Sequence, residues 1–350
     1  TAFSDLVALC QFLPGPASSQ LVFALGRRQA GLAGAFLASL CFTLPSALLM
    51  VAFAYGVATI DGLRHAAWLH GLKLAAVSIV AQAVWGMGRT LCPDRTRISL
   101  AVAAGAVLLL WPHAGTQVGV IVLGALAGWW FYRNVVTTTA GAPARSRRRH
   151  TGAAAALILC GALLLILPVL ADLTGGTRLA VLDGFYRAGA LVFGGGHVVL
   201  PLIRAEIVPP GWIDDNAFLA GYGAAQALPG PLFTFAAYLG TLIEGGPYAW
   251  SGGLLCLMAI MLPGWLLIGG ALPFWDLLRS KTWMQAALHG ANASVVGVLL
   301  AALYTPVWHE SVSGPRDAAA VLAGFALLQV WRVPPWLFVL LASAAGHGLL

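Results

Sequence analysis

Neutral hydrogen-bond donors surround two copies of one tetrapeptide, Leu-Pro-Gly-Pro, at Leu13–Pro16 and Leu228–Pro231. A helix that restarts after such a break presents unpaired backbone N–H groups and the positive end of its dipole, and these features bind anions. We therefore expect a site for a small oxyanion made of backbone N–H groups and neutral side chains. Its expected residues are Gln11, Pro14, Gly15, Pro16, Ser18, Ser19, Gln226, Pro229, Gly230, Pro231 and Thr234. The alternative is that the breaks are packing kinks and that the hydroxyls bond to their own backbone.

A third break is rich in glycine. Gly194, Gly195 and Gly196 interrupt the apolar segment Ala180–Val208 and precede His197. Glycines leave backbone N–H groups open to a ligand, so we expect this turn to join the anion site. His197 is a ligand or titrating group in one interpretation and a packing histidine in the other.

Arg187 is the leading candidate for a charged partner of the anion. It lies on an apolar stretch, Phe185–Phe193, and cations inside a membrane are costly and usually functional. The alternative is a structural ion pair with Asp183, four residues earlier on the same helix.

Two further cations, Lys73 and Arg204, are weaker candidates for charge partners. Lys73 can also extend from a helix end towards water. Arg204 ends the glycine-broken segment beside Glu206, and the sequence favours an interfacial pair between them.

The elements that hold these residues must be membrane helices. Of 350 residues, 60% are hydrophobic and 9% are charged, with a mean hydropathy of +0.86. Several apolar stretches are long enough to cross a bilayer, which takes roughly 20 helical residues. After a first broken segment that ends at Gly26, the sequence predicts apolar spans at Gly31–Ile60, Trp68–Gly88, Ile98–Trp111 and Gly115–Tyr132. The net charge of +7 sits mostly in short loops, which indicates membrane topology and not nucleic-acid binding. The five cysteines are scattered, and nucleotide-binding, metalloprotease and hydrolase motifs are missing, so we expect no metal, no cofactor and no enzyme.

The chain repeats itself. Pro14 and Pro229 lie 215 positions apart, Pro45 and Pro263 lie 218 apart, and His70 and His289 lie 219 apart, each within a matching motif. The offset between matching residues changes by only four positions, which indicates tandem duplication. We assign residues 1–132 to a first repeat, 133–152 to a basic cytoplasmic linker, 153–173 to a connecting transmembrane helix and 180–350 to the second repeat. The first repeat lacks a counterpart of Ala180–Val208, so we expect it to be incomplete at its N-terminus.

The single connecting helix predicts that the second repeat is inverted relative to the first. With the linker in the cytoplasm, this arrangement puts most Lys and Arg residues on the cytoplasmic side. Inverted repeats with broken helices are typical of secondary transporters. The predicted fold class is therefore an all-α integral membrane protein of two inverted helical repeats.

Four stretches carry a resemblance to a known family: Asp5–Gln20, Phe42–Ser46, Phe193–Pro201 and Gln226–Pro231. They are similar to the chromate transporter family in its long two-domain form, apparently without its first N-terminal unit. The resemblance implies a multi-pass carrier of the bacterial inner membrane that exports chromate and confers resistance to it. A carrier of sulfate or another oxyanion, and a channel or non-transporting membrane protein, are the alternatives. The sequence leaves open whether the chain forms a homodimer.

Overall fold

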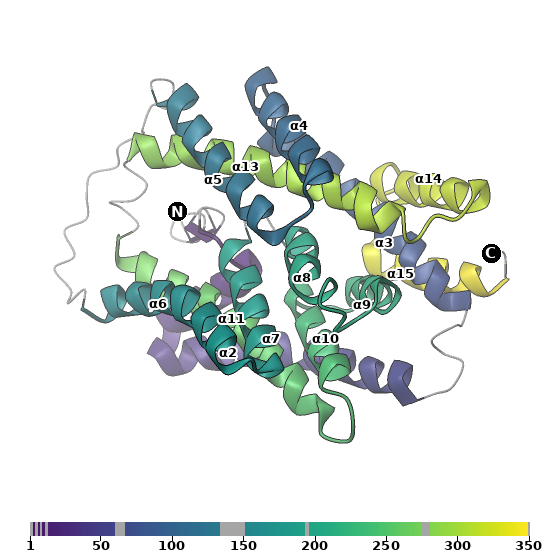
Figure 1. The fold of residues 1–350 in the computed structure, drawn as a ribbon, viewed down its shortest axis with the longest axis horizontal. Helices are drawn as coiled ribbons and strands as arrows, with labels where there is room; N and C mark the ends of the chain where they lie inside the picture. The colour runs from purple at the N-terminus through teal and green to yellow at the C-terminus, as the bar shows by residue number, and fades with distance from the viewer. Residues whose placement is uncertain are drawn as a thin grey trace.

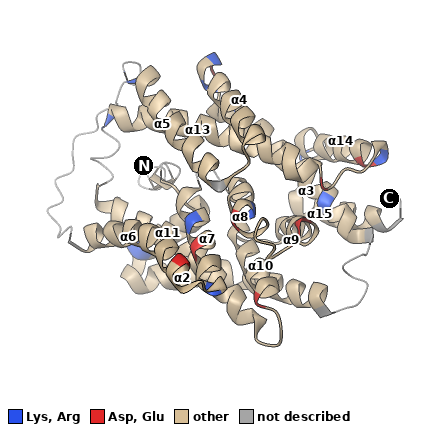
Figure 2. Ribbon diagram, in the orientation of Figure 1, with Lys and Arg blue, Asp and Glu red and all other residues tan. Residues whose placement is uncertain are grey.

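The computed structural model describes residues 3, 6–7, 9–10, 13–59, 67–133, 151–192, 196–274 and 281–348, and these form helices joined by turns and loops, without strands (Figure 1). Six of the described helices are long and apolar enough to cross a membrane. The expected all-α membrane protein is therefore confirmed. Most of the ribbon in Figure 2 carries neither Lys and Arg nor Asp and Glu, as a lipid environment requires.

The helices of the first half and the connecting helix follow the predicted segments. They are α2 (Ala17–Thr59), α3 (Ala67–Leu91), α4 (Arg95–Leu110), α5 (Ala114–Tyr132) and α6 (Thr151–Thr174).

The second half begins with the glycine-broken pair α7 (Thr177–Leu191) and α8 (Val199–Ile207), with a 3-10 turn at Gly196–Val198 directly before α8. The proline-broken pair follows as α9 (Asp215–Ala227) and α10 (Phe235–Glu244), with a 3-10 turn at Leu232–Thr234. The remaining helices are α11 (Ala249–Ala271), α13 (Thr282–Ala302), α14 (Pro315–Gln329) and α15 (Pro335–Gly348).

The long helix α2 contains a sharp bend. Ala30 and Gly31 leave the helical conformation, and Gly31 has φ +63°. The segments on either side fold together: a Cβ added at Gly26 would lie 2.3 Å from the carbonyl oxygen of Gly34, and the rings of Phe23 and Phe36 meet edge to face at 5.5 Å. The sequence predicted this division, because Gly31 was expected to begin a new apolar span.

The two halves exchange helix contacts. Helix α3 packs on α14 and α15, and its equivalent α13 packs on α4 and α5 (Figure 1). Glycines allow the close approach on both sides: a Cβ at Gly71 would lie 2.1 Å from the carbonyl oxygen of Ala342, and one at Gly290 would lie 1.9 Å from that of Gly124. Since Gly71 and Gly290 are equivalent positions, each half supplies the same surface to the other.

Two equivalent histidines, His70 and His289, also contact the opposite half of the chain through polar atoms. His70 Nε2 lies 3.0 Å from Asp317 Oδ1 on α14, and His289 Nδ1 lies 3.3 Å from Arg97 Nη1 on α4. Each histidine therefore contacts the first turn of the other half's penultimate helix, although the charge of its partner differs.

Candidate anion site at the helix breaks

The first Leu-Pro-Gly-Pro break is held by its own backbone and by Gln20. The Gln20 backbone N–H donates to the Pro16 carbonyl oxygen at 2.8 Å, which closes the first turn of α2. Its side-chain Nε2 donates to the Pro14 carbonyl oxygen at 2.7 Å. Gly15 has φ +120°, a conformation that side chains disfavour, and this explains glycine between the two prolines.

The same break contacts the second half of the chain at two points. The Gly15 N–H donates to the Val192 carbonyl oxygen at 2.7 Å, at the end of α7. A Cβ at Gly15 would lie 3.2 Å from Gly264 Cα, and one at Gly264 would lie 2.8 Å from Pro16 Cδ. Gly264 follows Pro263, the proline inside α11.

The second break makes the reciprocal contact. Gly230 has φ +152°, and a Cβ there would lie 2.3 Å from Ser46 Oγ. Ser46 follows Pro45, the proline inside α2. Each break therefore packs on the residue that follows the internal proline of the other half's long helix.

The described residues on either side of the glycine turn contact both breaks. Val192, just before it, accepts the hydrogen bond from Gly15, and a Cβ at Gly196 would lie 3.3 Å from Leu232 Cβ, just after the second break. His197 Nδ1 lies 2.9 Å from Tyr222 Oη and 3.4 Å from Gln226 Nε2. The structure thus brings together the described parts of all three breaks. Gln11, Gly194 and Gly195 lie outside the described residues.

The expected hydroxyl donors differ in their surroundings. Thr234 is buried and donates to the Pro231 carbonyl oxygen at 2.9 Å, as the packing-kink alternative expects. Ser18 is exposed. Ser19 is 1% exposed, and its Oγ has no partner in the part of the chain that the structure describes. Among these three hydroxyls, Ser19 alone is both buried and free to bind a ligand.

Arg187 is paired with carboxylates. Its Nη2 donates to Asp183 Oδ2, and its Nη1 lies 3.5 Å from Glu206 Oε1 on α8. A guanidinium between two carboxylates has no excess positive charge to offer a dianion, so the geometry favours the structural ion pair over the anion partner.

The other two cations also have partners outside the breaks. Arg204 pairs through Nε and Nη2 with both oxygens of Asp215, at 2.7 and 2.9 Å, so the expected pair with Glu206 is wrong. Lys73 Nζ donates to Asn216 Oδ1 at 3.0 Å.

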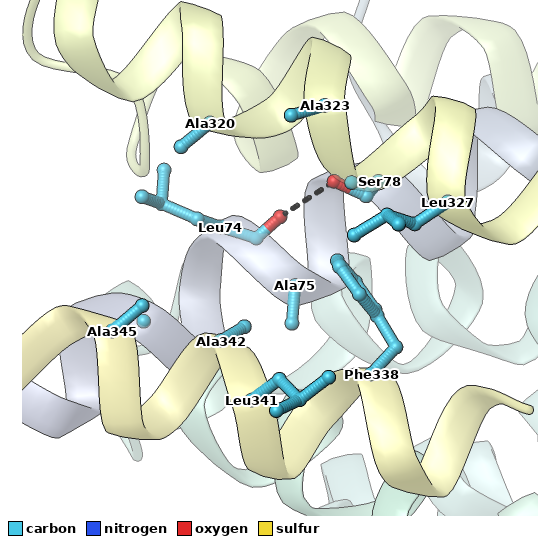
Figure 3. Close-up of a pocket in the computed structure, with 12 residues that line it drawn as sticks. Leu74, Ala75, Ser78, Ala320, Ala323, Leu327, Phe338, Leu341, Ala342 and Ala345 are labelled. Atoms are coloured by element: carbon cyan, nitrogen blue, oxygen red, sulfur yellow. Dashed lines mark hydrogen bonds between the residues drawn. The ribbon is translucent and has the colours of Figure 1, made fainter. Parts of the chain in front are cut away.

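A cavity of about 220 Å³ lies away from the breaks, between α3, α14 and α15. Its lining is almost entirely hydrocarbon, and the Ser78 hydroxyl at its edge already donates to the Leu74 carbonyl oxygen (Figure 3). Burying a charge among apolar groups is prohibitively costly, which excludes this cavity as the anion site.

Comparison with known families identifies the chain. The family described as chromate transporter matches residues 1–129 and again residues 179–347. This chain belongs to the chromate transporter family. Its relatives are transporters, so the chain is a multi-pass transporter-family protein and not an enzyme.

Individual relatives agree with this assignment. The chain is 30% identical to the chromate transport protein of Pseudomonas aeruginosa, over 94% of this chain and 78% of that protein. It is 24% identical to the chromate transport protein of Cupriavidus metallidurans, over 99% of this chain and 82% of that protein. It is 33% identical to the uncharacterized transporter YwrB of Bacillus subtilis, over 46% of this chain and 81% of that protein. No solved structure matches.

Ser46 and Gly264, the residues on which the breaks pack, were not among the expected site residues. A signal for them was present, because Leu-Pro precedes both at equivalent positions of the repeats. A proline inside a membrane helix frees a carbonyl group and marks a place where irregular backbone can meet.

Proposed function

We propose that this protein is a secondary transporter that carries chromate out of the cell across the bacterial inner membrane and so confers resistance to it. The observation that carries the proposal is the reciprocal packing of each Leu-Pro-Gly-Pro break on the long helix of the other half, at Gly264 and at Ser46. Broken helices that meet between two repeats are where transporters of this type bind their substrates. The Pseudomonas and Cupriavidus relatives are named chromate transport proteins, which favours chromate as that substrate.

The energetics suit export without ATP. Chromate is a dianion, and a charge that crosses the membrane potential gains about 2.3 kcal/mol per 100 mV. Two negative charges that leave an inside-negative cell therefore gain roughly 4.6 kcal/mol per 100 mV. Backbone N–H groups and neutral side chains bind a dianion without holding it as tightly as a fixed cation would, which permits release.

Chromate flux into everted membrane vesicles that contain the full-length protein tests this function. We expect saturable uptake that depends on the protein and collapses when the membrane potential is dissipated, with sulfate as a competitor because it is a tetrahedral dianion of similar size. Vesicles that take up sulfate but not chromate would replace the proposed substrate, and equal flux with and without the protein would refute the transport function.

We further propose that the two repeats lie in inverted orientation, with the basic linker, residues 133–152, in the cytoplasm. Arg89 near the end of α3 and Lys281 just before α13 are exposed and distinguish the alternatives, because α3 and α13 are equivalent helices. Inverted repeats put these two positions on the same face, and parallel repeats put them on opposite faces.

Single cysteines at positions 89 and 281, in a variant without the native cysteines, test this orientation with a membrane-impermeant maleimide. We expect both to react only from the cytoplasmic side, and a cysteine in place of Arg316 to react only from the outside. Reaction of positions 89 and 281 from opposite sides would contradict inversion.

A further inference from the structure

Unpartnered buried polar atoms gather on two helices beside the breaks. Among the described residues, nine buried side-chain nitrogen and oxygen atoms have no hydrogen-bond partner, and five of them lie on α2 and α11. These five are Ser19 Oγ, Gln20 Oε1, Ser39 Oγ, Thr43 Oγ1 and Trp265 Nε1. Since buried polar groups are nearly always paired, and an unpaired one is costly, such a concentration needs an explanation. Four of the five atoms can donate a hydrogen bond.

The hydroxyls follow one buried face of α2. Ser39, Thr43 and Ser46 are spaced four and three residues apart, which places them on one side of the helix, and they are 2%, 7% and 1% exposed. The opposite side carries exposed leucines, among them Leu37 and Leu48. A membrane helix that turns leucines outward and hydroxyls inward presents those hydroxyls to the protein interior.

This hydroxyl face leads directly to the second break. Ser46 is the residue against which Gly230 packs, and Thr43 lies one turn before it on the same face. Ser46 Oγ is itself satisfied, because it donates to the Thr43 carbonyl oxygen at 3.1 Å. The hydroxyls of Thr43 and Ser39 are left free.

The first break has a corresponding free donor. Trp265 follows Gly264, against which Gly15 and Pro16 pack. Its ring stacks on Phe23 at 6.2 Å, which fixes the indole, while its Nε1 is buried without a partner. Each break therefore packs on a helix of the other half that carries a free donor, three residues before the contact residue for Thr43 and one residue after it for Trp265.

We propose that Ser39, Thr43 and Trp265 donate hydrogen bonds to the transported oxyanion and help to determine its specificity, together with Ser19. The proposal rests on the function proposed above and adds residues to the same site. A tetrahedral dianion accepts hydrogen bonds at four oxygens, so it satisfies several donors that otherwise have no partner. Arg187 is paired with two carboxylates through Nη1 and Nη2, and only its Nε is buried without a partner among the described residues, so we assign the recognition mainly to these neutral groups.

The test compares Thr43→Val with Thr241→Val in purified full-length protein. Valine keeps the shape of threonine and removes its hydroxyl. Thr241 is the matched control because it is 3% exposed but its Oγ1 already donates to the Ala237 carbonyl oxygen at 2.8 Å. We expect Thr43→Val to raise the KM for chromate in vesicles about tenfold, the usual effect of losing one hydrogen bond to a charged ligand. Thr241→Val should change KM less than about twofold.

Thermal unfolding separates a binding role from a structural one. If Thr43 Oγ1 serves only the ligand, Thr43→Val should unfold at the same or a higher temperature without chromate, because it removes an unpaired buried group. It should lose the stabilisation that added chromate gives the wild type. Thr43→Ser keeps the hydroxyl and should keep both the KM and that stabilisation, and Trp265→Phe should resemble Thr43→Val.

Two results would overturn these claims separately. If wild type and Thr43→Val are stabilised equally by chromate and have equal KM, the donor role of Thr43 is refuted and the proposed function stands. If chromate neither stabilises nor crosses with the wild type, the proposed function is refuted, and the donor assignment with it.

Discussion

Replacement of Gly230 with alanine is expected to reduce chromate flux roughly tenfold or more while much of the protein still inserts in the membrane. Two costs combine at this position. The φ of +152° is one that side chains disfavour, and the new Cβ would lie 2.3 Å from Ser46 Oγ and 2.8 Å from Ser46 Cβ. Strain of this kind costs about 1–3 kcal/mol per site. It acts where the second break meets α2, so the break must move away from the site.

The repeat suggests a second substitution that should restore part of the flux, and Gly31 offers a control. Gly264 occupies the position equivalent to Ser46, so Ser46→Gly copies the contact that the first break already makes. The double variant Gly230→Ala with Ser46→Gly should regain part of the flux, because it removes the clash and leaves the backbone strain. Gly31→Ala has positive φ but no atom within 4 Å of the added Cβ, and it should keep most activity. Equal loss in Gly31→Ala and Gly230→Ala would show that strain alone matters and not the contact between the halves.

The helix breaks were predictable because their causes are local. Proline removes a backbone donor and glycine permits positive φ wherever they occur, so Leu13–Pro16, Leu228–Pro231 and the bend at Gly31 could be placed from the sequence. The repeat added long-range information, because equivalent positions were expected to play equivalent parts. The observed exchange of Gly71 and Gly290 contacts agrees with that expectation.

The partners of side chains across helices were harder to predict. Arg204 and Glu206 are neighbours in sequence, but both lie on α8, and residues two apart on a helix do not face each other. Arg204 instead reaches Asp215 at the start of α9, and Glu206 turns towards Arg187. These pairs depend on how α7, α8 and α9 pack, which no local pattern encodes. The same limit hid Thr43 and Trp265, whose significance lies in the partners that they lack.

Replacement of Arg187 with glutamine is expected to destabilise the protein and not merely to stop transport. Without the guanidinium, the carboxylates of Asp183 and Glu206 would be left beside each other. Gly184 allows α7 and α8 to approach closely at this point, since a Cβ there would lie 3.0 Å from Glu206 Cβ. Loss of one partner from a buried ion pair costs roughly 3–5 kcal/mol. The Arg187 side chain is 32% exposed, so we expect a smaller loss, about 1–3 kcal/mol in the free energy of unfolding.

A second substitution separates this structural role from direct anion binding. Arg187→Gln with Asp183→Asn removes one positive and one negative charge, and it should restore both the folded yield and most of the chromate flux. Arg178→Gln is the matched control, because Arg178 pairs with Glu244 but is 78% exposed, and surface pairs contribute little. The measurements are thermal unfolding of the purified protein and flux in vesicles. If the double variant folds like the wild type but carries no chromate, Arg187 binds the anion after all, and the ion pair holds it in place until substrate arrives.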